Sequence, residues 1–197
     1  MDIFQSLFML EALSVAASET APSFVVVSWW RDAGPQRWFA KDPAFDRQFR
    51  DAFLHQHEAA AAGELDHWRR SPEGALGLLL LLDQFPRNAF RNTARMYATD
   101  ARARQIANAA ILAGHDQAID PELRLFFYLP FGHSEALADQ ERSVELCRGL
   151  SGRSAERAEH HRDIVRRFGR FPHRNAILGR ASRPEELRYL AEGGFAG

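Results

Sequence analysis

The stretch from Ser71 to Asn88 reads SPEGALGLLLLLDQFPRN, and it decides the fold class. Ser71 followed by a proline and a glutamate is a typical helix start, because a serine side chain can accept the first free backbone N–H groups. The leucine-rich run that follows has no polar face, so we expect a helix that is buried on several sides. It is far shorter than the roughly 20 residues of a membrane-spanning helix. We expect Phe85-Pro86 to end this helix, because proline disfavours helical geometry in the residue before it.

The same helix signals recur along most of the chain. Cap residues and prolines precede runs with apolar side chains at helical spacing, and glycines follow several of these runs. Only residues 24–30 look strand-like, and one strand cannot form a sheet. The sequence therefore predicts an all-α fold, with helices from Asp42-Pro43 to Gly63, from Thr99-Asp100 to Gly114, from Asp120-Pro121 onward, over 134–150 and 155–168, and after a Ser182–Glu185 capping box.

Composition and charge narrow the class of protein. The 197 residues are 46% hydrophobic and 26% charged, which suits one globular domain, predicted over 24–197 after an N-terminal extension over 1–23. The net charge of −1 argues against nucleic acid or an anionic membrane as a partner. The single cysteine, Cys147, excludes an internal disulfide and a cysteine-rich zinc site, and it favours a reducing, cytoplasmic location.

No metal or cofactor motif is complete. A helical di-iron site needs two Glu-x-x-His elements, and the chain supplies one, from Glu64 to His67. The string His133-Ser134-Glu135 is similar to half of a deaminase zinc motif, but the cysteine pair of that motif is missing. Glycine-rich phosphate loops are absent from the sequence. We therefore predict no metal and no cofactor.

Two segments echo each other and hold many of the conspicuous polar residues. Residues 83–88 read DQFPRN, and residues 168–175 read FGRFPHRN. Each follows a helix-like run and contains Phe-Pro, arginine and asparagine. Because proline and asparagine favour turn geometry, we expect both segments to be ordered loops that present arginines beside a packed phenylalanine.

Three longer strings carry a resemblance to a known family. They are LLDQFPRNAFR at 81–91, FYLPFGHSE at 127–135 and HRDIVRRFGRFPHRN at 161–175. Together they resemble the bacterial family named domain of unknown function 924, over about Val25 to Phe195. The resemblance implies an antiparallel helical array of tetratricopeptide-like type and no established activity. The roughly 34-residue period of tetratricopeptide repeats cannot be traced in the sequence itself.

The arginines of these strings predict a site for an anionic ligand. Guanidinium groups bind carboxylates and phosphates bidentately, and neighbouring amides can orient such a ligand. The alternative is that the arginines cap helix ends and pair with acids, namely Asp83, Asp100, Asp163 or Glu185. The predicted ligand-binding residues are Asp83, Gln84, Arg87, Asn88, Arg91, Gln140, Arg170, His173, Arg174 and Asn175.

Three residues are candidates for acid–base catalysis. His133 and Glu135 lie in a Gly-His-Ser-Glu segment between two predicted helices, and His161 lies on the apolar face of another. The alternatives are that Ser134 merely caps the next helix and that His161 is a hydrogen-bonded core residue. The other histidines outside the echoed segments look solvent-exposed, and they are His55, His57, His67, His115 and His160.

Two functions remain open. One is a small-molecule pocket for a carboxylate or phosphate ligand, with the acid–base candidates beside the arginines. The other is an interaction module that presents a groove to a peptide and catalyses nothing. Peptide grooves usually rely on apolar or aromatic anchors, for which arginines are a poor substitute, so we favour the pocket. The expected partner is an unidentified anionic small molecule or peptide.

Overall fold

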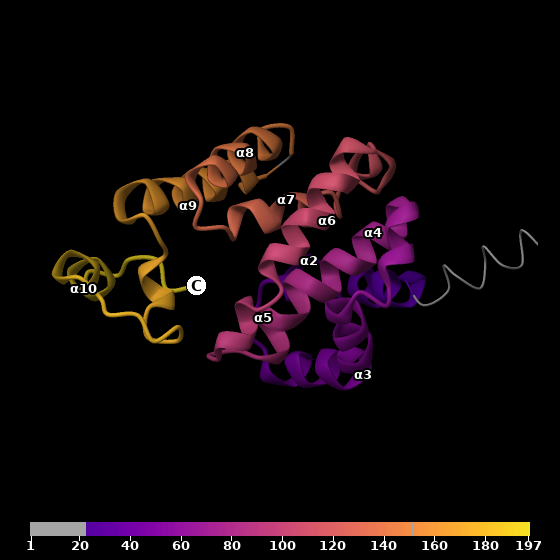
Figure 1. The fold of residues 1–197 in the computed structure, drawn as a ribbon, viewed down its shortest axis with the longest axis horizontal. Coiled ribbons are helices and arrows are strands. Elements are labelled where there is room, and N and C mark those ends of the chain that lie inside the picture. The colour runs from indigo at the N-terminus through magenta and orange to yellow at the C-terminus, as the bar shows by residue number, and fades with distance from the viewer. Residues whose placement is uncertain (1–22, 151) are drawn as a thin grey trace, which may run out of the picture.

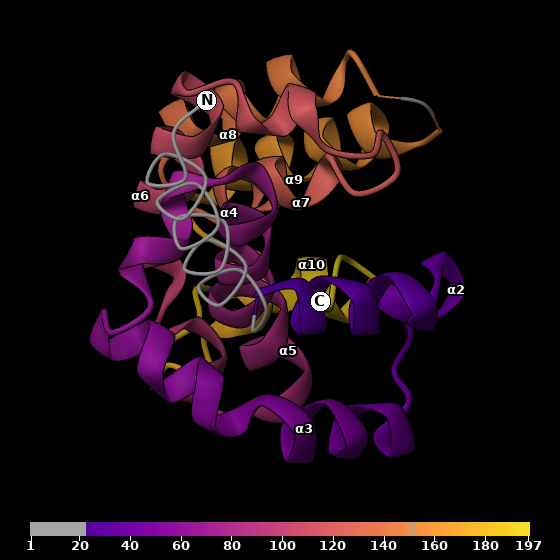
Figure 2. The ribbon, with the colours of Figure 1, turned by 90° about the vertical axis from the view of Figure 1, so that its right-hand side faces the viewer.

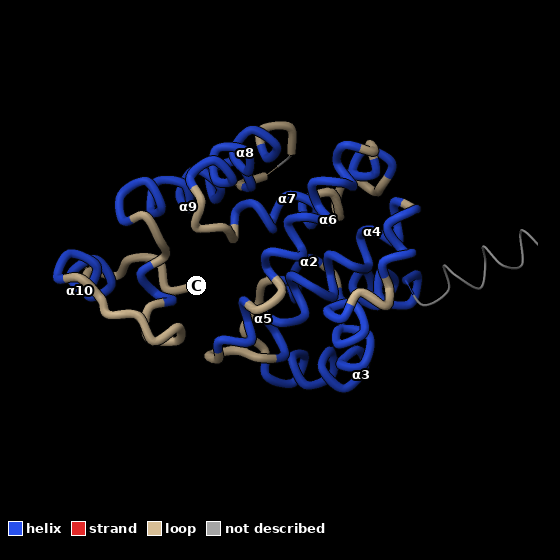
Figure 3. The backbone as a smooth tube through the Cα atoms, viewed as in Figure 1, coloured by secondary structure: helices blue, strands red, loops and turns tan. Residues whose placement is uncertain are grey.

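The computed structural model describes residues 23–150 and 152–197, so the predicted N-terminal extension lies outside the described residues except for Ser23. The described residues form helices and turns and contain no strand, which confirms the all-α prediction (Figure 3). A first helix covers residues 23–33. It is followed by α2 (Pro35–Trp38), α3 (Pro43–Ala62), η1 (Asp66–Arg70), α4 (Pro72–Leu79), η2 (Leu80–Gln84), α5 (Phe85–Ala89), η3 (Ala94–Tyr97), α6 (Asp100–Leu112), η4 (His115–Ala118), α7 (Leu125–Gly132), α8 (Leu137–Cys147), α9 (Ser154–Phe168), η5 (Pro172–Arg174) and α10 (Pro184–Ala191).

Several α-helices that are consecutive in the chain, or separated by one α-helix, pack against one another. α4 packs on α6, α6 on α7, α7 on α8 and α8 on α9, while α3 packs on α5 (Figure 1). Figure 2 shows α3 and the α7–α9 layer on opposite sides of the molecule. Beyond α9 the chain turns into η5 and α10, which lie at one end (Figure 1). None of the helices in the described part of the chain is long and apolar enough to cross a membrane.

The apolar side chains form two clusters of unequal size. The larger one contains the leucines from Leu78 to Leu82, all 0% exposed, as the sequence predicts. The smaller one joins the end of α9 to the C-terminal part and consists of Ile164, Val165, Phe168 and Phe171, with Tyr189 and Phe195 packed against them. The C-terminal part, defined here as residues 169–197, is therefore held by its own small core as well as by polar contacts.

The strand-like stretch of residues 24–30 is helical, so that expectation is wrong. Val26, Val27 and Trp30 lie at helical spacing and are each 0% exposed. Valine and tryptophan are common in strands because their side chains pack well on a half-buried surface. On this helix the same side chains are buried in the larger core, so the strand preference is not decisive.

Two helix starts agree closely with the sequence signals. Asp42 Oδ1 accepts hydrogen bonds from the backbone N–H of Ala44 at 2.9 Å, and α3 ends at Gly63, whose φ of 90° is readily adopted only by glycine. Ser71 Oγ accepts from the N–H of Gly74 at 3.1 Å and so caps α4. These signals act within three or four residues, which is why the sequence alone identifies them.

The prediction that Phe85-Pro86 ends the leucine-rich helix is wrong. The chain continues from α4 through the π-helical stretch η2 into α5, with the N–H of Phe85 donating to Leu80 O five residues back. A π-helical turn commonly occurs as a single turn inside an α-helix. Here it ends two residues before Pro86, which cannot donate a backbone hydrogen bond. The segment 83–88 is thus helical and not a loop.

Side chains from elsewhere in the chain satisfy the carbonyl groups of this irregular turn. His57 Nδ1 donates to Leu81 O at 2.9 Å, and Thr99 Oγ1 donates to Leu82 O at 2.6 Å. Buried carbonyl groups need such partners, so these bonds offset the lost helical ones. His57 is consequently buried at 5% exposure, and the expectation that it is solvent-exposed is wrong. Burial also lowers the pKa of His57.

Two helices start later than expected. The turn at Asp120, whose Oδ1 accepts from the N–H of Glu122 at 3.1 Å, precedes α7, which begins only at Leu125. The helix expected over 134–150 begins at Leu137. Ser134 Oγ accepts from Ala136 N at 3.1 Å and donates to a carboxylate in the first turn of α8, so it stabilises the turn before this helix.

The capping box before α10 is shifted by one residue. The N-cap residue is Arg183, and the carboxylate that closes the box belongs to Glu186, whose Oε2 accepts from Arg183 N at 2.7 Å. Ser182 Oγ instead accepts a hydrogen bond from Asn175 Nδ2 at 3.1 Å. Glu186, and not Glu185, closes the box because its buried carboxylate also accepts hydrogen bonds from Arg170 and Asn175.

Candidate functional site

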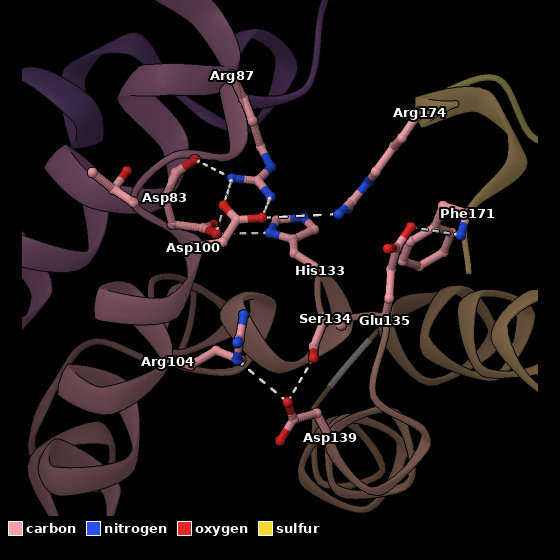
Figure 4. Close-up of polar contacts among 12 residues, drawn as sticks. Asp83, Arg87, Asp100, Arg104, His133, Ser134, Glu135, Asp139, Phe171 and Arg174 are labelled. Atoms are coloured by element: carbon pink, nitrogen blue, oxygen red, sulfur yellow. Dashed lines mark hydrogen bonds and ion pairs between the residues drawn. The ribbon is translucent and has the colours of Figure 1, made fainter. Parts of the chain in front are cut away.

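Polar side chains from several helical elements meet between the body of the molecule and the C-terminal part (Figure 4). The π-helical stretch η2 and α5 supply Asp83 and Arg87. η3 supplies Tyr97, α6 supplies Asp100, the residue after α7 is His133, and η5 supplies Arg174. We call these six residues the central polar cluster. The two echoed segments therefore meet in space, because each provides an arginine to this cluster.

Arg87 is fully engaged within the cluster. Its Nη1 and Nη2 donate to the two oxygens of Asp100 at 2.9 and 3.0 Å, and Nη1 also donates to the carbonyl of Asp83 at 2.7 Å. The Asp83 carboxylate lies 3.1 Å from the same nitrogen. A bidentate pair of this kind is a strong, directional contact. Arg87 therefore orients two carboxylates and has little capacity left for a ligand.

Asp83 and His133 form a buried pair. His133 Nδ1 lies 2.8 Å from Asp83 Oδ1, and Gln84 Nε2 donates to Asp83 Oδ2 at 2.6 Å. Burial opposes ionisation of Asp83, which is 1% exposed, but Arg87 and His133 outweigh it and lower its pKa to about 2. An ionised carboxylate can only accept, so the proton of the neutral imidazole resides on Nδ1 and Nε2 is an acceptor.

His133 is neutral near pH 7. Burial lowers its pKa, and the neighbouring Arg87 lowers it further, although Asp83 acts in the opposite direction. Its side chain is 15% exposed, whereas that of Asp83 is 1% exposed. Gln140, which is 0% exposed, supports the turn on both sides of His133 by donating to Gly132 O at 2.8 Å and Ser134 O at 2.6 Å. The imidazole is thus held in one orientation.

Arg174 differs from Arg87 in having no close acceptor. Its guanidinium group packs against the rings of Tyr97 and Phe171, with Cζ 4.5 and 4.6 Å from the two centroids. Asp100 Oδ2 is 3.9 Å from Nη1, which is too long for a hydrogen bond, and Nε has no partner among the described residues. Arg174 is nevertheless only 7% exposed. Figure 4 shows its guanidinium end pointing towards Asp100 and His133 from the opposite side.

Glu135 lies next to the cluster but is occupied by the C-terminal part. Arg180 donates to both of its oxygens at 2.6 and 2.9 Å, and the backbone N–H of Phe171 donates to Oε1 at 2.8 Å. Burial disfavours the charge of Glu135, but Arg180 and Phe171 overcome this effect and hold its pKa below its ordinary value. Glu135 therefore joins the loop before α8 to residues 171–180.

Four predicted ligand-binding residues lie in two other networks. Asn88 Nδ2 donates to Asp46 Oδ1 at 2.8 Å, and Arg91 Nε donates to Asp46 Oδ2 at 2.5 Å, so this pair joins α5 to α3. Arg170 donates to both oxygens of Glu186 at 2.7 and 2.8 Å, and Asn175 Nδ2 donates to Glu186 Oε2 at 3.2 Å. These residues pair with acids, as the alternative expects, but the acids are Asp46 and Glu186 and not the four that the sequence suggested.

His161 and His173 lie in the aromatic part of the smaller core. His161 is 4.7 Å from Phe195 and 5.5 Å from Phe171 between ring centroids, and its Nδ1 is 3.3 Å from Gly132 O. His173 packs on the same two phenylalanines, and its Nδ1 has no partner among the described residues. Burial lowers the pKa of His161 to about 3 and that of His173 to about 4.

Among the predicted site residues, the structure thus brings together Asp83, Gln84, Arg87, His133 and Arg174, with Gln140 behind them. The sequence reasoning did not select Tyr97 and Asp100 for the site. Asp100 was recognised as a helix start and as a possible arginine partner, but nothing in the sequence distinguishes Tyr97. No group of three or more histidine, cysteine or acidic residues in 23–150 and 152–197 is arranged to hold a metal ion.

The low pKa values of the two core histidines predict a pH-dependent stability. Below about pH 6.5 these histidines take up protons in the unfolded chain, whereas in the folded protein His161 and His173 stay neutral down to about pH 3 and 4. The unfolded state is thus favoured as the pH falls. We expect the free energy of unfolding to decrease by about 2 kcal/mol or more between about pH 7 and about pH 5.

Urea unfolding at several pH values measures this effect. His161→Phe should flatten the pH dependence, because it removes one of the groups whose protonation differs between the two states. His55→Gln is the matched control, since His55 is exposed. A free energy of unfolding that stays constant from about pH 7 to about pH 5 would contradict the assignment of buried, neutral histidines.

Comparisons with known proteins place the chain in a family without assigning an activity. A solved structure of a protein of unknown function from Agrobacterium tumefaciens is 56% identical, superposes with a TM-score of 0.87, and is matched over 88% of this chain and 99% of its own. No curated protein matches the chain. Residues 25–194 match the sequence profile of a family described as bacterial protein of unknown function (DUF924). The chain belongs to this DUF924 family.

Proposed function

We propose that the protein binds an anionic small molecule, a carboxylate or a phosphate, through Arg174, with the Asp83–His133 pair beside it to exchange a proton. The observation that carries this proposal is the state of Arg174. It is 7% exposed and packs against two aromatic rings, its Nε has no hydrogen-bond partner among the described residues, and the carboxylate paired with it, Asp100, stays 3.9 Å from Nη1. A buried charged group without hydrogen bonds is costly. An anion that accepts from its free N–H edge would remove that cost.

The surroundings favour Arg174 over the other arginines as the ligand-binding group. Arg87, Arg91, Arg170 and Arg180 each donate to both oxygens of a carboxylate. Their charges are therefore already compensated within the protein. The rings of Tyr97 and Phe171 both pack against the guanidinium group of Arg174. Rings stack on the face of such a planar group, and its N–H groups suit bidentate recognition of a planar or tetrahedral anion.

His133 supplies the chemistry that the proposal assigns to the site. The Nδ1 proton of His133 is directed at Asp83, which accepts its hydrogen bond, so Nε2 is left as an acceptor. The lowered pKa of His133 keeps the imidazole neutral near pH 7. An imidazole oriented by a carboxylate is the usual arrangement of a general base. We assign no such role to Glu135, whose oxygens accept from Arg180 and Phe171, or to His161, which packs among phenylalanines.

Replacing Arg174 with glutamine should weaken anion binding by about tenfold or more, because a hydrogen bond to a charged group contributes roughly 1.5–3 kcal/mol. Isothermal titration calorimetry with benzoate and phenyl phosphate measures the affinity. These two probes share a phenyl ring and differ in the anionic group. The matched control is Arg148→Gln, because Arg148 is an exposed arginine at the end of α8. We expect the control to bind as the unmodified protein does.

The His133 assignment has its own readout. The ¹⁵N chemical shifts of its ring nitrogens should show the proton on Nδ1 in the free protein and a change at Nε2 when the probe binds. Equal affinities of the Arg174→Gln variant and the unmodified protein would disprove the Arg174 site. Failure of both probes to bind would also reject it, and would leave the peptide-interaction module as the better explanation of the helical array.

A further inference from the structure

The charges around Arg174 bear on which kind of anion the proposed site accepts. Arg87 and Arg174 contribute two positive charges, Asp83 and Asp100 contribute two negative ones, and His133 is neutral near pH 7. The central polar cluster is thus electrically balanced before any ligand binds. A ligand with one negative charge leaves a net charge of −1, whereas a dianion leaves −2 in a largely buried setting.

Asp100 is the group that a second ligand charge would oppose most directly. Its Oδ2 lies 3.9 Å from Arg174 Nη1 and accepts from Arg87 Nη2 at 3.0 Å. An anion seated on the Nη edge of Arg174 therefore comes close to this carboxylate. Asp100 is 7% exposed, so water screens the repulsion between the two anions poorly.

The helix geometry around Arg174 also favours a singly charged ligand. Phosphate sites commonly use a helix N-terminus, whose free N–H groups attract a multiply charged anion. The ion pair with Asp100 brings the N-terminus of α6, a helix of 13 residues, next to Arg174, and the first residue of this helix is Asp100 itself. A carboxylate in the first turn already complements the positive end of the helix dipole. The remaining donor is one planar guanidinium edge, which matches the two oxygens of a carboxylate.

We infer that the ligand of the proposed Arg174 site is a monocarboxylate rather than a phosphate ester, and that Asp100 determines this specificity. The inference rests on the proposed function, since it concerns the same site. It assigns to Asp100 a role beyond pairing with Arg87. The Asp100 carboxylate repels a ligand with two negative charges, whereas Arg174 still binds a ligand with one.

Benzoate and phenyl phosphate test this inference directly by isothermal titration calorimetry at about pH 7.5, where a phosphate monoester is mainly a dianion. We expect benzoate to bind about tenfold more tightly, because of the added repulsion from Asp100. Asp100→Asn should narrow or reverse the ratio by strengthening phenyl phosphate binding about tenfold. Asp163→Asn, which changes an exposed aspartate on α9, is the matched control and should leave the ratio unchanged.

A second measurement on the unmodified protein avoids dependence on how well Asp100→Asn folds. Phenyl phosphate becomes a monoanion as the pH falls below about 6. Its affinity should therefore rise between about pH 7.5 and about pH 5.5, while that of benzoate should stay nearly constant. Burial lowers the pKa of His133, and benzoate, which keeps its single charge over this range, is the control for any protonation of the protein.

The outcomes separate this inference from the proposed function. If both probes bind with equal affinity, or phenyl phosphate binds more tightly at about pH 7.5, the carboxylate specificity is wrong while the Arg174 site stands. If benzoate binds more tightly but Asp100→Asn folds and leaves the ratio unchanged, Asp100 is not the determinant and the inference fails in that part. If neither probe binds, the proposed function fails, and the specificity fails with it.

Discussion

Phe85→Ala should lower the free energy of unfolding by about 4 kcal/mol, because it removes a large buried ring and leaves a cavity. Phe85 is 0% exposed and lies at the junction between η2 and α5. Its ring centroid is 4.7 Å from that of His57, 5.2 Å from that of Phe49 and 5.8 Å from that of Phe90. Urea unfolding followed by circular dichroism measures the effect.

The matched control for this substitution is Phe39→Ala. Phe39 is also an aromatic residue that touches others, but it is 49% exposed, so its loss should lower the free energy of unfolding by about 1 kcal/mol or less. If Phe85→Ala is no more destabilising than this control, the ring does not anchor the irregular turn. The distinction matters for the site, because the same turn carries Asp83 and Arg87.

Glu186→Ala should destabilise the protein by about 3–4 kcal/mol, since it leaves buried hydrogen-bond donors and a positive charge without their partner. Glu186 is 0% exposed and accepts from Arg170, from Asn175 and from the backbone N–H of Arg183. The bonds from Arg170, together with those from Arg183, keep its pKa well below the ordinary value. Urea unfolding gives the total change in stability.

Hydrogen exchange shows where the loss of stability is concentrated. The amides of residues 169–191 should exchange faster in Glu186→Ala, because this network holds the C-terminal part together. Glu185→Ala is the matched control: the neighbouring side chain is 54% exposed and lies 3.5 Å from Arg183, and an exposed pair of this kind contributes about 1 kcal/mol or less. Similar effects of the two substitutions would refute the assigned role of Glu186.

The different surroundings of the two echoed segments explain why their structures differ. Their similar sequences predict two similar loops, but residues 83–88 continue a helix whereas residues 172–174 form the short helix η5. The first segment is surrounded by the larger core and by donors from α3 and from the residue before α6. The second follows Gly169, which ends α9 with a φ of 70°. Similar local sequence therefore does not dictate similar structure when the surroundings differ.

The sequence by itself determined the fold class, the buried leucines and the helix starts at Pro43 and Pro72. These features depend on interactions within a few residues, such as the side-chain caps of Asp42 and Ser71, or on the hydrophobicity of a continuous run. It also identified the residue types that gather at the site, because arginine, histidine and carboxylate groups within three strings are visible without a structure.

Only the tertiary structure decided that Arg174, unlike Arg87, Arg91, Arg170 and Arg180, lacks a hydrogen-bonded carboxylate. Arg91 pairs with Asp46 and Arg180 with Glu135, each across 45 residues of sequence, so neither pair can be read from local spacing. Arg174 instead packs against the ring of Tyr97, and its Nη1 lies 3.9 Å from Asp100 Oδ2. Each arginine could form an ion pair with several acids in an extended chain. Packing of the helices brings a carboxylate within hydrogen-bond distance of Arg87, Arg91, Arg170 and Arg180 but not of Arg174, because distances between elements, not residue types, select the pairs.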